Sequence, residues 1–232
     1  MKHHPIANVL MLAGLLSLGP AAVAGVQPEA AVLWVNADDG EAIISIKNTD
    51  SLPIMLLTKI EPIGEDKRKL LSVMPPLARV EGHSSKPVRF VLTGDRDFST
   101  QRLQRIYFAG LPINTRVGNN IDVGGGLNLP VIINPKGLAM KRDPWTLLQW
   151  RVVNHQLAVK NASPYVVCLA QTVIASPGDH KWLLPRGYVL PGEQLLLPAN
   201  NQASLDGVSR ITLYPVAIDG YAVDSYTADV DQ

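Results

Sequence analysis

The side chains that most often perform catalysis or hold metal ions are few in this chain. Beyond residue 24 its histidines are His83, His155 and His180, and none stands at a metal-ligand spacing from another. The motifs G-x-S-x-G and H-E-x-x-H are absent from the sequence. The single cysteine, Cys168, can form neither an internal disulfide nor a cysteine-based zinc site, and its apolar neighbours predict a buried small hydrophobe. We therefore expect no enzyme activity, no metal and no cofactor.

The residues that suggest a function are apolar and lie in residues 121–133. Every odd position of this segment is apolar or glycine, whereas most even positions are polar, glycine or proline. One face of an extended chain is then apolar over the whole segment, which is long for a strand. Such a strand can complete a partner that lacks one, because its main chain pairs with open sheet edges and its side chains fill an apolar groove. The candidate contact residues are Ile121, Val123, Leu127, Leu129, Val131 and Ile133.

The alternative for this segment is that its apolar face fills the core of its own domain. The three glycines at residues 124–126 count against a purely structural strand, because glycine weakens a strand and often marks the close approach of another backbone. Both interpretations stay open at the level of the sequence.

Short period-2 runs bounded by turn residues recur along the chain, and no segment keeps a sustained helical stripe. Proline and glycine at residues 134–137 interrupt pairing and mark a connector. We predict an all-β chain of two immunoglobulin-like β-sandwich domains, residues 25–135 and residues 136–232. The strands are expected at residues 31–36, 41–47, 54–60, 86–92, 105–109 and 121–133, and then at residues 147–153, 156–160, 166–174, 188–190, 194–197, 209–215 and 220–227.

The first 24 residues have a basic start, an apolar run and a small-residue end at Ala22-Val23-Ala24, which is typical of a secretory signal peptide. The apolar run is too short to span a bilayer and no later stretch is long enough, so we expect an exported protein without membrane insertion. The net charge of +1 gives no reason to expect nucleic acid as a partner.

Five segments, in matching order and spacing, resemble the family of periplasmic pilus-assembly chaperones. Among them are PPLARVEGHSSKPVRF at residues 75–90, RIYFAGLP at residues 105–112 and LAVKNASPYVV at residues 157–167; the others are residues 44–62 and 189–197. The resemblance implies two immunoglobulin-like domains set at an angle around a cleft, in a periplasmic chaperone that binds pilus subunits by donor-strand complementation. The partners that it implies are pilus subunits and the outer-membrane usher that receives them.

The sequence departs from this family at the site that holds the subunit's terminal carboxylate. Most members use an arginine on the first strand and a lysine near the end of the donor strand. Here Pro130 stands at the lysine position, and residues 28–32 contain no arginine. Antiparallel pairing would bring other cations to this end of the sheet, each of which could instead belong to a solvated basic rim. The candidate anchors are Arg105, Lys59, Arg102 and Lys136.

Arg105 is the first choice among these cations, because its planar fork suits a carboxylate better than the point charge of a lysine. A second function class is an exported two-sandwich adhesin or pilus structural subunit. Such a protein needs an N-terminal extension of alternating apolar residues, and residues 25–30 are too short to supply one. The sequence leaves open which subunit is bound and whether the empty chaperone self-associates through its exposed strand.

Overall fold

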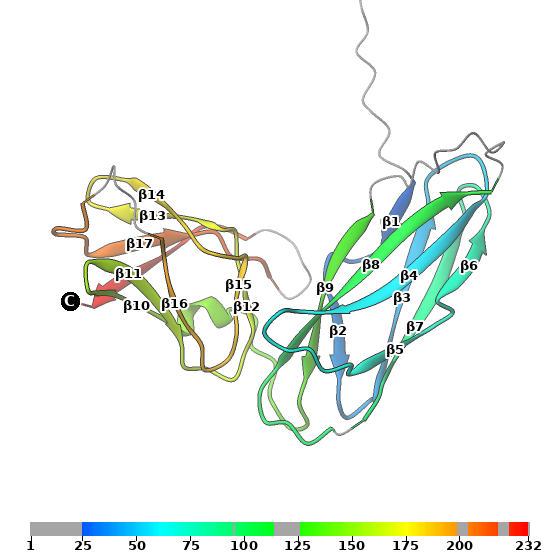
Figure 1. Cartoon of the computed structure of the whole chain (residues 1–232), viewed down its shortest axis with the longest axis horizontal. Coiled ribbons are helices and arrows are strands. Elements are labelled where there is room, and N and C mark those ends of the chain that lie inside the picture. The colour runs from blue at the N-terminus through cyan, green and yellow to red at the C-terminus, as the bar shows by residue number, and fades with distance from the viewer. Residues whose placement is uncertain (1–24, 95, 114–125, 199–203, 218–222, 232) are drawn as a thin grey trace, which may run out of the picture.

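The computed structural model describes residues 25–94, 96–113, 126–198, 204–217 and 223–231, which form two β units joined by a short connector (Figure 1). Within these residues the one helix is the short 3-10 turn η1 (Pro144–Leu147). The prediction of an all-β chain is confirmed. No helix of the described part is long and apolar enough to cross a membrane.

The first unit is a sandwich of two sheets. One sheet has the order β1-β3-β7-β5 and the other has the order β2-β9-β8-β4-β6. The sequence patterns predict no separate strands at β1, β5 and β6. The strands are β1 (Val26–Pro28), β2 (Leu33–Asn36), β3 (Glu41–Asn48), β4 (Ile54–Pro62), β5 (Leu71–Met74), β6 (Leu77–Val80), β7 (Ser85–Leu92), β8 (Arg102–Pro112) and β9 (Leu127–Asn134).

The core of the first unit follows from the period-2 pattern of its strands. On β3, Ile44 and Ile46 are buried while the intervening Ser45 is half-buried and Ile43 is exposed. On β8, Ile106 and Phe108 point into the same core and are fully buried. Alternation therefore fixes which face of each sheet packs inward and which face remains for other contacts.

The first strand passes from one sheet to the other, and this crossing shapes the site described below. β1 pairs antiparallel with β3, whereas β2 pairs parallel with β9. Glu29 lies at the crossing, where its N–H donates to Ser45 O (3.0 Å) and its carboxylate accepts from the Ser45 N–H (2.8 Å). The Glu29 side chain thus continues the pairing with β3 as the main chain turns away from it.

The second unit is one strongly curled sheet of order β14-β13-β17-β18-β10-β11-β16, together with the pair β12-β15. Its core contains Trp150, Leu157 and Leu197 among other buried side chains. The sequence patterns do not predict β14. The strands are β10 (Leu148–Val153), β11 (Gln156–Asn161), β12 (Val167–Cys168), β13 (Thr172–Ser176), β14 (His180–Leu183), β15 (Tyr188–Val189), β16 (Gln194–Leu196), β17 (Arg210–Leu213) and β18 (Tyr226–Asp231).

A third apolar cluster joins the two units. From the first unit it contains Leu103 and Ile132, and from the second it contains Val166, with Cys168 and Tyr188 packed against it. Since this cluster is separate from the two cores, it fixes one unit against the other through burial of apolar surface.

The side chain of Gln101 adds hydrogen bonds across the same interface. Gln101 is buried; its amide oxygen accepts from the Val166 N–H (2.9 Å), and its amide nitrogen donates to Asn134 Oδ1 (3.0 Å). Its own N–H donates to Pro164 O (2.8 Å). The start of β8, the end of β9 and the second unit are therefore tied to one side chain.

Candidate functional site

The first half of β9 has a strand on one side only among the described residues. β8 pairs with β9 from Leu127 to Ile133, but β2 pairs with β9 only from Val131 onward. Residues 127–130 therefore form an open sheet edge, which is a template for pairing with another chain.

The direction of the main-chain groups on this edge follows from one hydrogen bond further along β9. Asn134 O accepts from the N–H of Ala37, so the main-chain groups of residue 134 face the side of β2. Because these groups alternate along a strand, those of Asn128 and Pro130 face the same side, where the edge is open. Proline lacks an N–H and is tolerated in strands at such edges, which accounts for Pro130 within β9.

An open groove of about 500 Å³ runs along this edge, between residues 27–31 and residues 127–129. The groove exists because the first strand crosses between the sheets, so that among the described residues β9 has β8 as its one neighbour here. Leu127 lines the groove and is 39% exposed, so it presents apolar surface beside unpaired main chain. The combination fits an extended segment with apolar side chains.

The structure separates the residues that the sequence grouped as one contact face. Leu129, Val131 and Ile133 are 3% exposed or less and lie in the core of the first unit. For these three residues the burial supports the alternative, a face that fills its own domain. Leu127 is accessible, whereas Ile121 and Val123 lie outside the described residues.

Arg105 lies on the opposite face of the same sheet, toward the second unit. Its Nε donates to Asn128 Oδ1, and its Nη2 lies 3.4 Å from Asn128 O. Its charge acts on Cys168 and Tyr188 of the second unit, which places it in the cleft between the units. No carboxylate of the described residues lies within ion-pair distance of the Arg105 guanidinium. Arg105 is thus held in place by Asn128 while its charge is not neutralised by a partner.

Two other candidate anchors are placed differently. Lys59 is on the cleft face two rungs away, where it pairs with Glu61 (3.0 Å), and its side chain is 65% exposed. Lys136 is exposed beyond the end of β9. The structure therefore does not gather the four predicted cations into one cluster.

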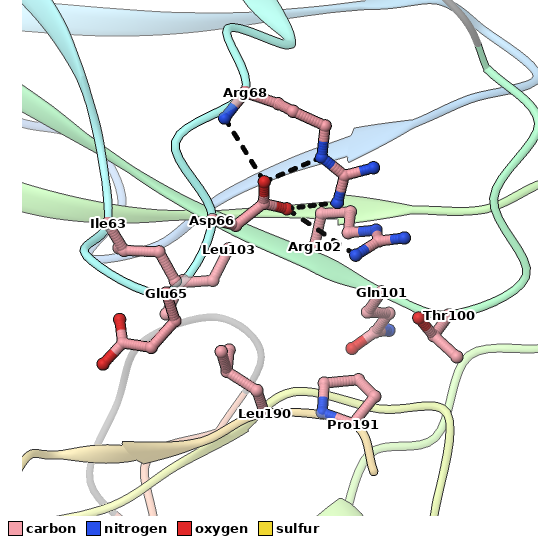
Figure 2. Close-up of a pocket in the computed structure, with 10 residues that line it drawn as sticks. All are labelled: Ile63, Glu65, Asp66, Arg68, Thr100, Gln101, Arg102, Leu103, Leu190 and Pro191. Atoms are coloured by element: carbon pink, nitrogen blue, oxygen red, sulfur yellow. Dashed lines mark hydrogen bonds and ion pairs between the residues drawn. The ribbon is translucent and has the colours of Figure 1, made fainter. Parts of the chain in front are cut away.

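Arg102 belongs to an ion cluster in a pocket of about 340 Å³ between the two units (Figure 2). Asp66 accepts from Arg68 Nε (2.7 Å) and Nη2 (2.5 Å), and Arg102 Nη1 lies 3.6 Å from the same carboxylate. The hydrogen bond from Arg68 lowers the pKa of Asp66. Burial, and then the charge of Arg68, lower the pKa of Arg102. Arg102 thus already has a carboxylate partner, Asp66, whereas Arg105 has none among the described residues.

A neighbouring network of polar groups links the first unit to the second. Glu65 pairs with Arg186 (3.0 Å) and accepts a hydrogen bond from the hydroxyl of Tyr188 (2.9 Å). Arg186 also pairs with Glu193 and stacks on the ring of Tyr188. Burial and then the bond to Glu65 raise the pKa of Tyr188 to about 12.

Two further features of the cleft concern metals and thiol chemistry. Cys168 lies beside the interface cluster, and burial raises the pKa of its thiol to about 11. A thiol with so high a pKa is a poor nucleophile at neutral pH. In the part of the chain that the structure describes, no group of three or more His, Cys, Asp and Glu side chains could hold a metal ion.

Four residues that the sequence patterns did not predict contribute to the cleft: Asn128, Tyr107, Glu65 and Arg186. Asn128 and Tyr107 could have been identified from strand parity, because Tyr107 lies two residues from Arg105 on β8 and Asn128 lies opposite Tyr107 on β9, so all three share one face. Glu65 and Arg186 come from loops of different units, and no local pattern brings them together.

Comparisons with known proteins agree along almost the whole described chain. The family model for the N-terminal domain of PapD, the pili and flagellar-assembly chaperone, matches residues 25–139, and the model for the C-terminal domain of the pili assembly chaperone PapD matches residues 143–219. A relative described as the uncharacterized fimbrial chaperone YhcA of Escherichia coli (strain K12) is 30% identical over 207 residues, covering 89% of this chain and 91% of the relative.

Solved structures show the same fold. The crystal structure of the chaperone YadV superposes with a TM-score of 0.73 at 13% identity, covering 88% of this chain and 99% of that one. The structure of the Salmonella enterica SafA pilin in complex with the SafB chaperone also matches this chain, with a TM-score of 0.69 at 21% identity. The match covers 88% of this chain and 95% of the other. The prediction of two immunoglobulin-like domains around a cleft is confirmed by this likeness.

Proposed function

The chain belongs to the family of pili assembly chaperones, and from that premise we propose that the open edge of β9 is where it receives a pilus subunit. The resemblance inferred from the sequence is thereby confirmed at the level of the family and of its function as a chaperone of pilus subunits.

The observation that carries the proposal is the unpaired edge at residues 127–130 beside an open groove. A subunit strand that pairs with this edge gains main-chain hydrogen bonds, and apolar side chains of the subunit cover Leu127. Ile121 and Val123 precede this edge in sequence with the same parity as Leu127, so we assign them to the same contact. The contact set proposed here is Ile121, Val123 and Leu127.

Arg105 is the proposed anchor for the subunit's terminal carboxylate. The cleft offers its guanidinium beside the open strand, already oriented by Asn128. A carboxylate that leaves water requires a charged partner, and arginine can bind it with two parallel hydrogen bonds. We assign no such role to Arg102, because it already shares Asp66 with Arg68, and none to Lys59 or Lys136.

The partners, the cellular location and the domain boundaries are proposed from the family and the sequence. SafB, which resembles this chain, was solved with a pilin, and we propose the same class of partner here, with an outer-membrane usher as the recipient. The signal-like first 24 residues support a periplasmic location, and residues 25–135 and 136–232 are the proposed domains. We propose no enzyme activity, and the adhesin or pilus-subunit alternative is not favoured because both family models are of chaperones.

A matched pair of substitutions two residues apart tests the proposed edge. Leu127→Asp should leave the chain folded, because Leu127 is 39% exposed, but should abolish co-purification of a co-expressed pilus subunit. A carboxylate facing an apolar groove without a partner costs several kcal/mol. Leu129→Asp should instead unfold the first domain, because Leu129 is buried in its core.

Circular dichroism and affinity pull-down from periplasmic extract distinguish these outcomes. Subunit capture by a folded Leu127→Asp variant at the level of the unmodified chaperone would contradict the assignment of this edge. Loss of folding in Leu127→Asp would show that the residue has only a structural role.

A further inference from the structure

The ring of Tyr107 lies against Gly126, the residue that precedes β9. A Cβ placed on Gly126 would come closer than 3.0 Å to three atoms of Tyr107, namely Cζ, Cε2 and Oη. No residue larger than glycine fits there unless the ring moves. Tyr107 pairs with Asn128 in the ladder, so its side chain leans one rung toward the start of β9.

The requirement for glycine at position 126 comes from this contact and not from backbone conformation. The φ of Gly126 lies outside the left-handed region, so its backbone is open to any residue. Gly126 is exposed, and the Tyr107 ring alone supplies the nearest atoms. A substitution at this position therefore reports on the ring.

Arg105, two residues before Tyr107 on β8, contacts β9 in the same diagonal way. It pairs with Pro130 in the ladder, and its side chain reaches Asn128. Two side chains of β8 therefore contact the cleft face of β9 where, among the described strands, only β8 pairs with it. A strand end with one neighbour and an adjacent glycine would otherwise fray, since glycine has the largest conformational freedom to lose.

We propose that Tyr107 is a positioning residue for subunit capture, because its ring over Gly126 holds the open edge of β9 in the extended conformation that a subunit strand must pair with. A preformed edge lowers the entropic cost of association. The inference rests on the proposed function of this edge and adds the group that prepares it.

The experiment compares five purified variants with the unmodified chaperone: Tyr107→Ala, Tyr107→Phe, Gly126→Ala, the double variant Tyr107→Ala/Gly126→Ala and the control Gly64→Ala. Gly64 is exposed, has an ordinary φ and has no atom within 4 Å of the place that an added Cβ would take, so its substitution removes the same backbone freedom without a clash. Binding of a co-expressed pilus subunit is measured by displacement kinetics. Hydrogen exchange is followed at the amides of Leu127 and Leu129, which face β8.

We expect Gly126→Ala and Tyr107→Ala each to weaken subunit binding roughly tenfold and to speed exchange at both amides, with the melting temperature of the domain kept. Tyr107→Phe and Gly64→Ala should stay within about twofold of the unmodified chaperone. The double variant should bind no worse than Tyr107→Ala, because without the ring the alanine meets no obstacle.

Three results would overturn the proposal: unchanged binding by Gly126→Ala, a double variant whose losses multiply, or faster exchange without weaker binding, which would make the contact purely structural. Should Tyr107→Ala fail to fold, the comparison of Gly126→Ala with Gly64→Ala decides alone. If the unmodified chaperone binds no subunit, the proposed function fails, whereas the exchange measurements still report whether the ring orders the edge.

Discussion

Replacing Arg105 by alanine should weaken the capture of an intact pilus subunit while leaving the chaperone folded. The guanidinium donates to Asn128 through Nε and one Nη2 hydrogen, and this leaves both Nη1 hydrogens and the other Nη2 hydrogen free for a carboxylate. No carboxylate of the described residues neutralises it. A subunit carboxylate therefore competes with solvent and not with an existing ion pair.

The expected magnitude follows from the partial exposure of this site. A hydrogen bond to a charged group contributes about 1.5–3 kcal/mol. Arg105 is half-buried, so solvent screens the pair and the lower part of that range applies, about 1.5–2 kcal/mol. That corresponds to roughly 10- to 30-fold weaker binding.

Calorimetry on a double-mutant cycle isolates this interaction. Binding is measured for the chaperone and for its Arg105→Ala variant. Each is tested by displacement with an intact subunit and with a subunit whose terminal residues are deleted. The variant should lose affinity for the intact subunit only. Lys59→Ala is the matched control, because Lys59 shares the cleft face but is paired with Glu61. Equal loss for both subunits, or no loss for either, would show that Arg105 does not hold the carboxylate.

Three further predictions concern the interior of the first domain and the interface between the two domains. Asn48→Ala should lower the free energy of unfolding of the first domain by about 1–3 kcal/mol in urea, because its buried amide donates to Leu52 O (2.9 Å) and Val80 O (3.2 Å), which would lose their partner. Cys168 should resist iodoacetamide at pH 8 in the folded chaperone and react after denaturation, since desolvation in the interface raises its pKa to about 11; rapid labelling of the folded protein would contradict this raised pKa. The pKa of Tyr188 is raised to about 12, so the folded state holds this proton more tightly than the unfolded chain does. The corresponding stability is present below pH 10 and is lost as the pH rises toward 12. Ultraviolet titration with Tyr188→Phe as the control should detect this transition, and a midpoint near pH 10 would refute the raised pKa.

Much of the fold could be predicted because strand patterning is local. The runs at residues 41–47 and 54–60 agree closely with β3 and β4, since alternation of buried and exposed side chains is written in adjacent residues. β5 and β6 were missed because each is short and borders the Pro75-Pro76 pair, where turn residues dominate the pattern. The family could also be recognised from the sequence, because its turns and prolines keep their spacing.

The contact face could be predicted only in part, because alternation identifies a face without saying what covers it. In residues 121–133 the odd positions share one face, but the partner of that face changes along the strand. At Leu129, Val131 and Ile133 the opposite sheet covers it, whereas Leu127 lies beside the groove where the first strand crosses between sheets. That crossing depends on Glu29 and Ser45, which lie far from β9 in sequence.

Parity also separates two arginines of β8 that the sequence treated alike. Arg102 and Arg105 are an odd number of residues apart, so their side chains leave opposite faces of one strand. Arg102 turns to the loop that carries Asp66 and joins an ion cluster with Arg68 in the pocket between the two domains. Arg105 turns to the cleft, beside the open strand edge, and donates to the amide and carbonyl oxygens of Asn128. Since a buried or partly buried cation is stabilised chiefly by an opposite charge, the arginine whose neutralising partner is missing from the described residues is the one positioned to receive a carboxylate from another molecule.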